Sequence, residues 1–380
     1  ETPTEATTLP PEETTEPTEN EDNMEKEKKS KIKKILVNLT IFILLIILTF
    51  SLVLKDQDVS QIFSVAAKVK KQYILFAVLA MSIYILGEAV NITRILKELG
   101  EKSKLISNIR YTLIGFFFSA ITPAASGGQP MEIYYMHKDD ISVANSTLAL
   151  LMQLCSLQIV TITVGTISAV IHFEVLKSGL IYLLILGIIL NSSALMLLII
   201  AIFSKRLSEG LIKFVVKLLK FFRIPNVEKK QEKLEKELES YQTSAKYIKE
   251  HKILMLKTVI TTVVQMIAYY SVPYWIYLAF GLTEYNIFEI LTLQAVLYAT
   301  VSGIPSPGAV GVSEGGFLGI FRNAFPETII SSAMLLTRGA NFYLFIIISA
   351  IIVMISTFRE KRIEKKQMQE TEVLTEKSEK

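Results

Sequence analysis

The sequence predicts an all-α integral membrane protein with six full transmembrane helices and two re-entrant helical hairpins. Of its 380 residues, 51% are hydrophobic, and they gather in long blocks between charged segments. About 20 apolar residues, rising 1.5 Å each, cross a hydrocarbon core of roughly 30 Å. Six blocks reach this length: 35–54, 73–93, 142–171, 179–203, 253–280 and 328–357.

Two further apolar blocks, 108–136 and 286–325, are interrupted by proline and glycine. The interruptions read Thr122-Pro-Ala-Ala-Ser-Gly-Gly-Gln-Pro130 and Ser306-Pro-Gly-Ala-Val-Gly311. Lipid cannot hydrogen-bond exposed backbone, so non-helical chain at membrane depth must be buried in protein or line a wet cavity. Each block is therefore predicted to form a pair of half-helices. Matched interruptions in the two halves of a chain point to the binding site of a transporter.

The two interruptions supply the first candidate site residues. Glycine permits close backbone approach, and a helix that starts at mid-depth presents unpaired N–H groups and a partial positive charge. Such a site suits a ligand that carries a phosphate. The candidates are Pro123, Gly127, Gly128, Gln129, Pro307, Gly308 and Gly311.

Charge predicts the orientation of the chain. Lysine and arginine mark the cytoplasmic side, and basic clusters lie at 26–34, 94–104, 205–252 and 359–366. Six crossings place all four clusters and both termini in the cytoplasm only if each hairpin enters and leaves on one side. The first hairpin then enters from the cytoplasm and the second from outside, as in inverted repeats. The alternative is that Pro/Gly hairpins merely look alike.

The chain divides into five predicted parts. In order, they are a disordered tail, a first membrane half, a connector, a second membrane half and a charged cytoplasmic tail, at 1–31, 32–204, 205–252, 253–358 and 359–380. Residues 205–223 are expected to press an amphipathic helix onto anionic lipid. The chain begins with Glu1, and the sequence leaves open whether 1–23 belong to the native protein.

The few cysteine and histidine residues argue against disulfides and metal sites in this chain. Cys155 is the single cysteine, and His137, His172 and His251 lie far apart. No disulfide within the chain and no cysteine-rich metal site is expected, and no P-loop is visible. We therefore predict no metal, no cofactor and no nucleic-acid partner. The energy source and the oligomeric state stay open, with a homo-oligomer among the options.

Four ionisable residues within apolar blocks are the charged site candidates: Glu88, Glu132, Glu314 and Arg338. Each costs roughly 2.5–3.5 kcal/mol on insertion scales, so each is expected to face a cavity or a partner. For Arg338 the nearest anion in the sequence is Glu314, and a lipid phosphate is the functional alternative. The structural alternative is that Arg338 forms a buried ion pair that only fixes helix register.

Two expectations concern the glutamates and the uncharged polar residues. Glu132 and Glu314 are expected in the first turns of their half-helices, where a carboxylate caps the helix dipole or binds a cationic head group. Gln153, in the third full block, either lines a polar path or makes interhelical hydrogen bonds worth about 0.6 kcal/mol each. We favour the packing role for Gln153.

The interrupted stretches Phe117–Met136 and Pro305–Phe317 are similar to the paired signatures of the lysylphosphatidylglycerol synthase transmembrane family. The resemblance covers about residues 32–358 and includes a later arginine, here Arg338. This family is the membrane half of the bacterial multiple peptide resistance factor, and it also occurs as stand-alone proteins.

The resemblance implies a flippase-like role in the cell membrane. In two-domain members this part is thought to move aminoacylated phosphatidylglycerol to the outer leaflet, which lowers negative surface charge and repels cationic peptides. A separate soluble domain transfers lysine from lysyl-tRNA. Only residues 359–380 follow the resemblance here, so we expect that domain to be absent. A phosphatidylglycerol lysyltransferase activity would then rest on the family name alone.

Two other classes of function stay open. One is a membrane transferase acting on a lipid-linked substrate, with Glu132 or Glu314 as general base. The other is a non-catalytic membrane partner that binds a separate aminoacyl-phospholipid synthase through 205–252. We favour the translocation of a phospholipid substrate over either alternative, and lean against an enzyme.

Overall fold

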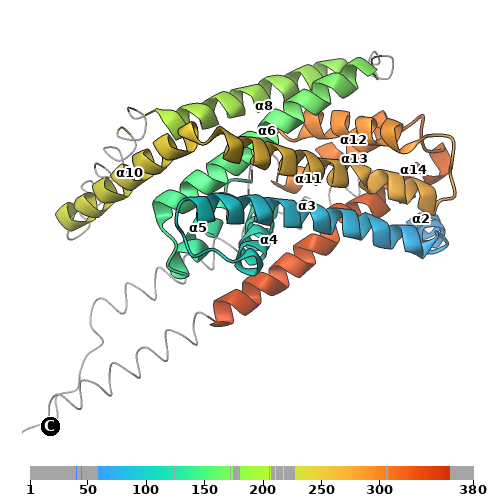
Figure 1. The fold of residues 1–380 in the computed structure, drawn as a ribbon. Coiled ribbons are helices and arrows are strands. Elements are labelled where there is room, and N and C mark those ends of the chain that lie inside the picture. Colours follow the sequence, from blue (N-terminus) through green and yellow to red (C-terminus); the bar gives the residue numbers. More distant parts are fainter. Residues whose placement is uncertain are drawn as a thin grey trace, which may run out of the picture.

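Every regular element in the described part of the protein is a helix (Figure 1). The structure, a computed structural model, describes residues 59–122, 125–171, 180–204, 227–304 and 307–359, with a few isolated positions elsewhere. The predicted all-α class is confirmed for these ranges. The predicted span 35–54 and the predicted interfacial segment 205–223 lie almost wholly outside the described residues.

Five helices are long and apolar enough to cross a membrane. They coincide with five of the six predicted spans. The first four are α3 (Lys71–Glu98), α6 (Val143–Ile171), α8 (Leu180–Phe203) and α11 (Lys252–Ala279). The fifth is a continuous helix from Glu327 to Arg359, which contains α14 (Glu327–Arg338) and the π-helical turn η3 (Gly339–Tyr343).

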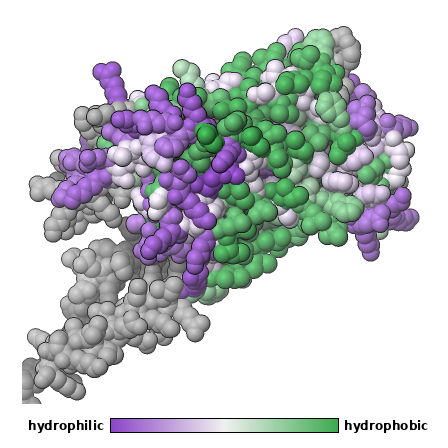
Figure 2. Space-filling view, viewed as in Figure 1, coloured by the Kyte–Doolittle hydropathy of each residue, from purple (hydrophilic) through white to green (hydrophobic). Residues whose placement is uncertain are grey.

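The outer surface carries an apolar belt with polar ends (Figure 2). On α11, large apolar side chains recur every three or four residues and are exposed: Ile253, Leu256, Ile260, Val264 and Ile267. That spacing makes one continuous stripe along a helix. An exposed apolar surface of this extent is unfavourable in water and suits lipid.

The first interrupted block forms a hairpin of α4 (Leu105–Ile121) and α5 (Gly128–Lys138). The two helices approach closely at Gly128, which has no side chain. An added Cβ there would lie only 2.0 Å from Oγ of Ser119. At the open end of this hairpin, Asp139 accepts hydrogen bonds from Arg110 and from the hydroxyl of Tyr111. Both ends of the hairpin therefore lie together.

The second interrupted block forms a matching hairpin. It contains α12 (Ile287–Val301), the short turn η2 (Pro307–Ala309) and α13 (Val312–Ile320). The ring of Tyr277 contacts Tyr285 before α12 and Phe325 after α13, with centroids 6.2 and 5.5 Å apart. Both ends of this hairpin therefore lie beside the last turns of α11.

The two hairpins enter the bundle from opposite ends. The amide N–H of Lys70 donates to the carbonyl of Ala279 at 3.0 Å, which places the start of α3 beside the end of α11, where the second hairpin opens. At the other end of α3, Asn108 of the first hairpin donates to Thr93 at 2.7 Å. The short helices α4 and α12 have 17 and 15 residues. At 1.5 Å per residue, each falls short of a hydrocarbon core of about 30 Å.

The breaks share a backbone conformation at aligned positions. Ala125 and Ala309 each stand two residues after the proline of their break, Pro123 and Pro307, and have φ of 54° and 53°. A left-handed conformation costs a residue with a Cβ roughly 1–2 kcal/mol. Two alanines that adopt it at the same place after the proline indicate that the two breaks share a local geometry.

The connector helix α10 (Val227–Glu250) packs at the end of the bundle where the first hairpin opens. Ser244 of α10 donates to Asn145 at 2.8 Å, and Asn145 donates to Glu101 at 2.7 Å. Tyr247 of α10 donates to Glu98 at 3.2 Å. These contacts tie the connector to the loop between α3 and α4. The remaining described helix, α2 (Val59–Ala67), packs against α14 at the opposite end.

Candidate functional site

A cavity of about 300 Å³ lies between the tips of the two hairpins. Residues of both hairpins line it. Ser119, Ala120 and Ala125 come from the first hairpin. The second hairpin contributes Ser302, Gly303, Ile304, Gly308, Ala309 and Ser313, and the long C-terminal helix adds Arg338, Asn341 and Phe342. The interruptions therefore surround a cavity, as the need to satisfy non-helical backbone requires.

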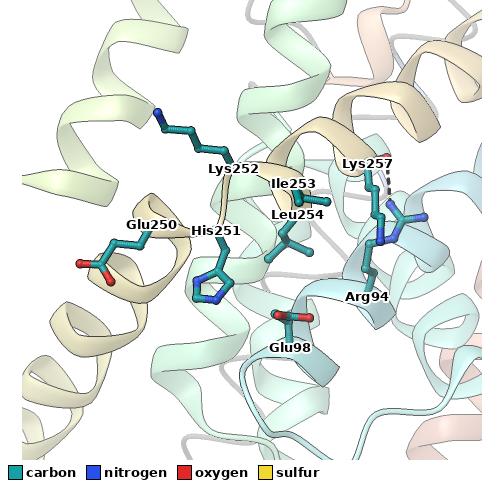
Figure 3. A pocket seen from close by; sticks show the side chains of 8 residues that line it. All are labelled: Arg94, Glu98, Glu250, His251, Lys252, Ile253, Leu254 and Lys257. Carbon is teal, nitrogen blue, oxygen red and sulfur yellow. Dashed lines mark hydrogen bonds between the residues drawn. The ribbon is translucent and has the colours of Figure 1, made fainter.

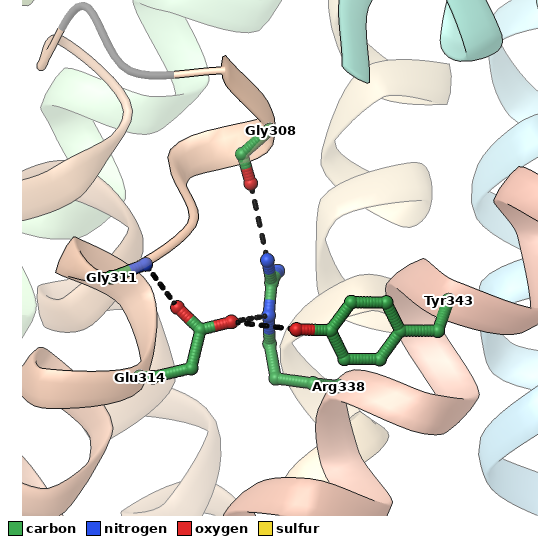
Figure 4. Close-up of polar contacts among 5 residues, drawn as sticks. All are labelled: Gly308, Gly311, Glu314, Arg338 and Tyr343. Carbon is green, nitrogen blue, oxygen red and sulfur yellow. Dashed lines mark hydrogen bonds and ion pairs between the residues drawn. The ribbon is translucent and has the colours of Figure 1, made fainter. Parts of the chain in front are cut away.

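A buried ion pair forms one wall of the cavity (Figure 4). Nε of Arg338 donates to Oε1 of Glu314 at 2.8 Å, and Glu314 is fully buried. The other carboxylate oxygen accepts the amide N–H of Gly311 at 2.7 Å. Glu314 thus caps the first turn of α13, as predicted, and also neutralises Arg338. The geometry brings together three predicted site residues: Gly311, Glu314 and Arg338.

Two further contacts hold Arg338, and one more holds its partner Glu314. Its Nη2 donates to the carbonyl of Gly308 at 3.1 Å. Its guanidinium lies 4.0 Å from the ring centre of Phe342, a favourable cation–π distance. Tyr343 donates to the same Glu314 oxygen at 3.2 Å. Phe342 and Tyr343 reach these positions from the π-helical turn η3, a type of helix distortion that occurs frequently at functional sites.

The close approach of Gly308 to Phe342 explains one of the predicted glycines. Gly308 has φ of 59° and contacts the ring so closely that an added Cβ would lie 2.2 Å from Cζ. Pro307 begins the turn η2 just before it. Pro123, its counterpart in the first break, lies outside the described residues.

The first hairpin differs in how its second half-helix begins. The amide N–H of Gly127 donates to the hydroxyl of Thr122 at 2.9 Å, so a threonine takes the capping role that Glu314 has in the second hairpin. The prediction that Glu132 lies in the first turn is wrong, because α5 starts at Gly128 and has no acidic residue there. Gln129 is half-buried beside Gly128.

Glu88 and Glu132 do not line the cavity. Glu132 is 3% exposed, Glu88 is half-buried on α3, and the two lie close enough to interact electrostatically. The structure therefore divides the four charged candidates into two groups, Glu314 with Arg338 and Glu88 with Glu132.

Gln153 belongs to a hydrogen-bonded network between helices. Its Oε1 accepts from Asn91 of α3 at 2.8 Å, and its Nε2 donates to Gln265 of α11 at 3.2 Å. Asn91 also donates to the hydroxyl of Thr262 at 3.0 Å. These contacts join α3, α6 and α11 and do not reach the cavity, so the geometry favours the packing role.

We expect Gln153→Leu to lower the free energy of unfolding. The substitution removes the donor to Gln265 and one acceptor of Asn91, and an unsatisfied buried polar group costs about 1–3 kcal/mol. Gln158→Leu on the same helix is the matched control, because the Oε1 of Gln158 is buried without a hydrogen-bond partner. Denaturant unfolding in detergent measures both variants. Equal losses would contradict a stabilising role for the network.

A larger hollow of about 500 Å³ lies at the end of the bundle where the first hairpin opens (Figure 3). Within it, Arg94 donates to the main-chain carbonyl of Lys257 at 3.0 Å. Its rim carries charges of both signs on Arg94, Glu98, Glu250, Lys252 and Lys257. Apart from Arg94, these charged side chains are exposed, so this hollow belongs to the polar end of the molecule rather than its interior.

Several cavity residues were not singled out from the sequence. Tyr84, Tyr269 and Tyr298 form an aromatic wall, with ring centroids 5.2–5.3 Å apart in successive pairs. Asn341 also lines the cavity, and its buried Oδ1 has no hydrogen-bond partner. Asn341 stands three residues after Arg338, and this proximity is the one signal that could have identified it. The tyrosines come from three separate helices and carry no local motif.

The described part of the chain contains no group of three or more His, Cys, Asp or Glu residues arranged to hold a metal ion. Cys155 is buried as a free thiol. The polar groups that face the cavity are instead hydroxyls, one amide and the paired guanidinium.

The apolar belt, the five long helices and the cavity between two broken hairpins define a multi-pass membrane protein. The sequence matches the family described as "Lysylphosphatidylglycerol synthase TM region" over residues 35–349, and the chain belongs to that family. No curated protein matches the chain. Membership agrees with the resemblance carried by the two interruptions and indicates a function connected with membrane lipid.

Proposed function

We propose that this protein translocates a phospholipid across the cell membrane, and that the cavity between the two hairpins holds the lipid head group. The observation that carries the proposal is the position of the cavity, between the tips of two half-crossing hairpins that enter from opposite ends. A ligand at that point can be reached from either side if one hairpin moves at a time. Aminoacylated phosphatidylglycerol is the first candidate substrate, because the family is named for it.

The charged wall of the cavity supports a head group as the ligand. Arg338 has more N–H donors than Glu314 and Gly308 use, so a phosphate oxygen can bind without breaking the ion pair. The pair is neutral as a unit, which lowers the cost of keeping Arg338 inside an apolar bundle. Hydroxyls and the amide of Asn341 supply further polar contacts.

The arrangement in the membrane follows from the same proposal. Both hairpins are re-entrant and the two halves are inverted repeats, which the matching left-handed alanines support. The end that carries α10 and the first hairpin's mouth faces the cytoplasm, together with both termini. Export of a cationic lipid would reduce the negative surface charge and contribute to resistance against cationic peptides.

We expect Asn341→Leu to slow lipid exchange without destabilising the fold. The buried Oδ1 of Asn341 has no hydrogen-bond partner. A leucine of similar volume therefore breaks no hydrogen bond at this atom, and it removes a polar group from the cavity wall. A loss of about tenfold would correspond to about 1.4 kcal/mol of head-group interaction. The assay uses liposomes with fluorescent phosphatidylglycerol or lysyl-phosphatidylglycerol, and measures the fraction of label that reaches the outer leaflet.

Thr337→Val is the matched control. Thr337 lies on the same helix and also has a buried hydroxyl without a partner, but it does not line the cavity. Its variant should exchange lipid at the wild-type rate. Absence of exchange with both lipids, in wild-type protein that is folded and monodisperse, would refute the proposed function. Equal effects of the two substitutions would refute the assignment of the cavity.

A further inference from the structure

Glu132 occupies an unusually dry site for a carboxyl group. Its side chain packs against Gly115 of α4, where an added Cβ would lie 2.0 Å from Oε1. Its Oε2 is buried and accepts no hydrogen bond. An ionised carboxylate in such a place would lose its hydration without any compensation, which costs far more than burying the neutral acid.

The neighbouring arginines are bound to other groups. Arg94 donates to Asn91 at 2.9 Å, Arg110 is paired with Asp139 at the mouth of the hairpin, and Arg338 is paired with Glu314. Helix α6, which packs against α5, carries no charged residue. The packing helices α3, α4, α5 and α6 therefore direct no free arginine toward Glu132 in the described part of the chain.

The groups that face Glu88 do not supply a positive charge either. Tyr84 and Tyr298 interact electrostatically with Glu88. Tyr269 and Tyr270 of α11 contact these tyrosines through their rings. All four are neutral phenols and supply no cation to Glu88. Two carboxyl groups that influence each other without a cation between them disfavour double ionisation.

We propose that Glu88 and Glu132 form a proton-exchange site that couples lipid movement to protons, an inference that rests on the proposed function. In the conformation described here Glu132 carries the proton. On exchange, the O–H bond of Glu132 breaks and the proton passes to the Glu88 carboxylate or to water. Tyr84 connects the pair to the cavity, because it both lines the cavity and lies beside Glu88.

The position of Glu132 shows how a proton would act on the first hairpin. The side chain is wedged between α5 and α4 at Gly115. Ionised Glu132 would need water or a cation, and neither fits at that contact while the helices stay closed. Loss of the proton would therefore favour separation of α5 from α4, the helix that supplies Ser119 and Ala120 to the cavity wall. Return of the proton would favour closure.

Infrared difference spectroscopy on the purified full chain tests the proton site directly. A protonated carboxylic acid has a carbonyl band distinct from that of a carboxylate. At neutral pH we expect this acid band in the wild type and its loss in Glu132→Gln. Glu314→Gln is the control, because Glu314 is ion-paired and should contribute a carboxylate band instead. If Glu132→Gln folds poorly, Glu88→Gln should still shift the acid band. An unchanged acid band in both variants would overturn the proposal.

A pH gradient across liposomes tests the coupling. The rate of fluorescent lipid exchange should depend on the direction of the gradient in the wild type, and this dependence should vanish in Glu132→Gln. Wild-type exchange that ignores the gradient would overturn the coupling and leave the translocation function intact. If no lipid is exchanged at all, the proposed function fails, and the infrared band alone then decides whether the proton site exists.

Discussion

Arg338→Ala is expected to destabilise the protein by about 3–5 kcal/mol, because it leaves a buried carboxylate without its cation. Glu314 has no exposed surface and takes its charge partner from Arg338 alone among the described residues. The loss should appear as a lower unfolding midpoint in detergent. Lipid exchange should fall with it, since the guanidinium forms part of the cavity wall.

Two further variants separate the ion pair from a general loss of packing. Glu314→Gln in the Arg338→Ala background removes the uncompensated charge, so part of the stability should return. Lys236→Ala breaks an exposed pair with Glu232, also 2.8 Å long, and should cost at most about 1 kcal/mol. If Arg338→Ala and Lys236→Ala are equally mild, the buried pair is not what holds α13 against α14.

Gly308→Ala is expected to reduce both stability and lipid exchange. The left-handed φ of 59° adds strain of about 1–2 kcal/mol once a Cβ is present. The new methyl group would also displace the ring of Phe342, and such overpacking costs typically about 1–3 kcal/mol. Phe342 supports the guanidinium of Arg338 and contacts Phe116 of the first hairpin, with ring centroids 6.0 Å apart.

Gly281→Ala isolates the strain from the displacement of the ring. Gly281 has φ of 80°, but an added Cβ there meets no atom within 4 Å. Unfolding measurements on both variants should therefore show a larger loss for Gly308→Ala, and only that variant should affect exchange. Equal losses of stability in the two variants would mean that the ring of Phe342 can move aside without an energetic cost. Its contact with Gly308 would then not position Arg338.

The helical spans were predictable because each depends on a contiguous run of side chains. Residues 253–280 are apolar enough to mark a helix, and α11 follows within one residue at each end. The breaks were equally visible, since proline and glycine cannot continue a helix in lipid without support. Placing every basic cluster on one side of the membrane then required hairpins of opposite direction, and the structure has them entering from opposite ends of the bundle.

The candidate site was only partly predictable. The pairing of Glu314 with Arg338 was the nearest choice in sequence, and a separation of 24 residues across one hairpin made it reachable. Glu132 followed the same pattern in the sequence, yet it lies beyond the first turn of α5, where Thr122 provides the cap. Glu132 stands nine residues after Pro123 and Glu314 seven after Pro307, a difference in spacing too small to reveal that the two glutamates take different positions.

The sequence by itself determined the class of the protein, the position of the five spans that the structure describes and the residues at its two interruptions. These properties depend on composition over short stretches. Every stretch that crosses the hydrocarbon core needs enough apolar residues and must satisfy its own backbone hydrogen bonds. Only the tertiary structure decided where the charged groups lie: Arg338 pairs with Glu314 at the cavity, whereas Glu88 and Glu132 do not line it. Those positions depend on how α3, α4, α5 and α14 pack, which local composition does not encode.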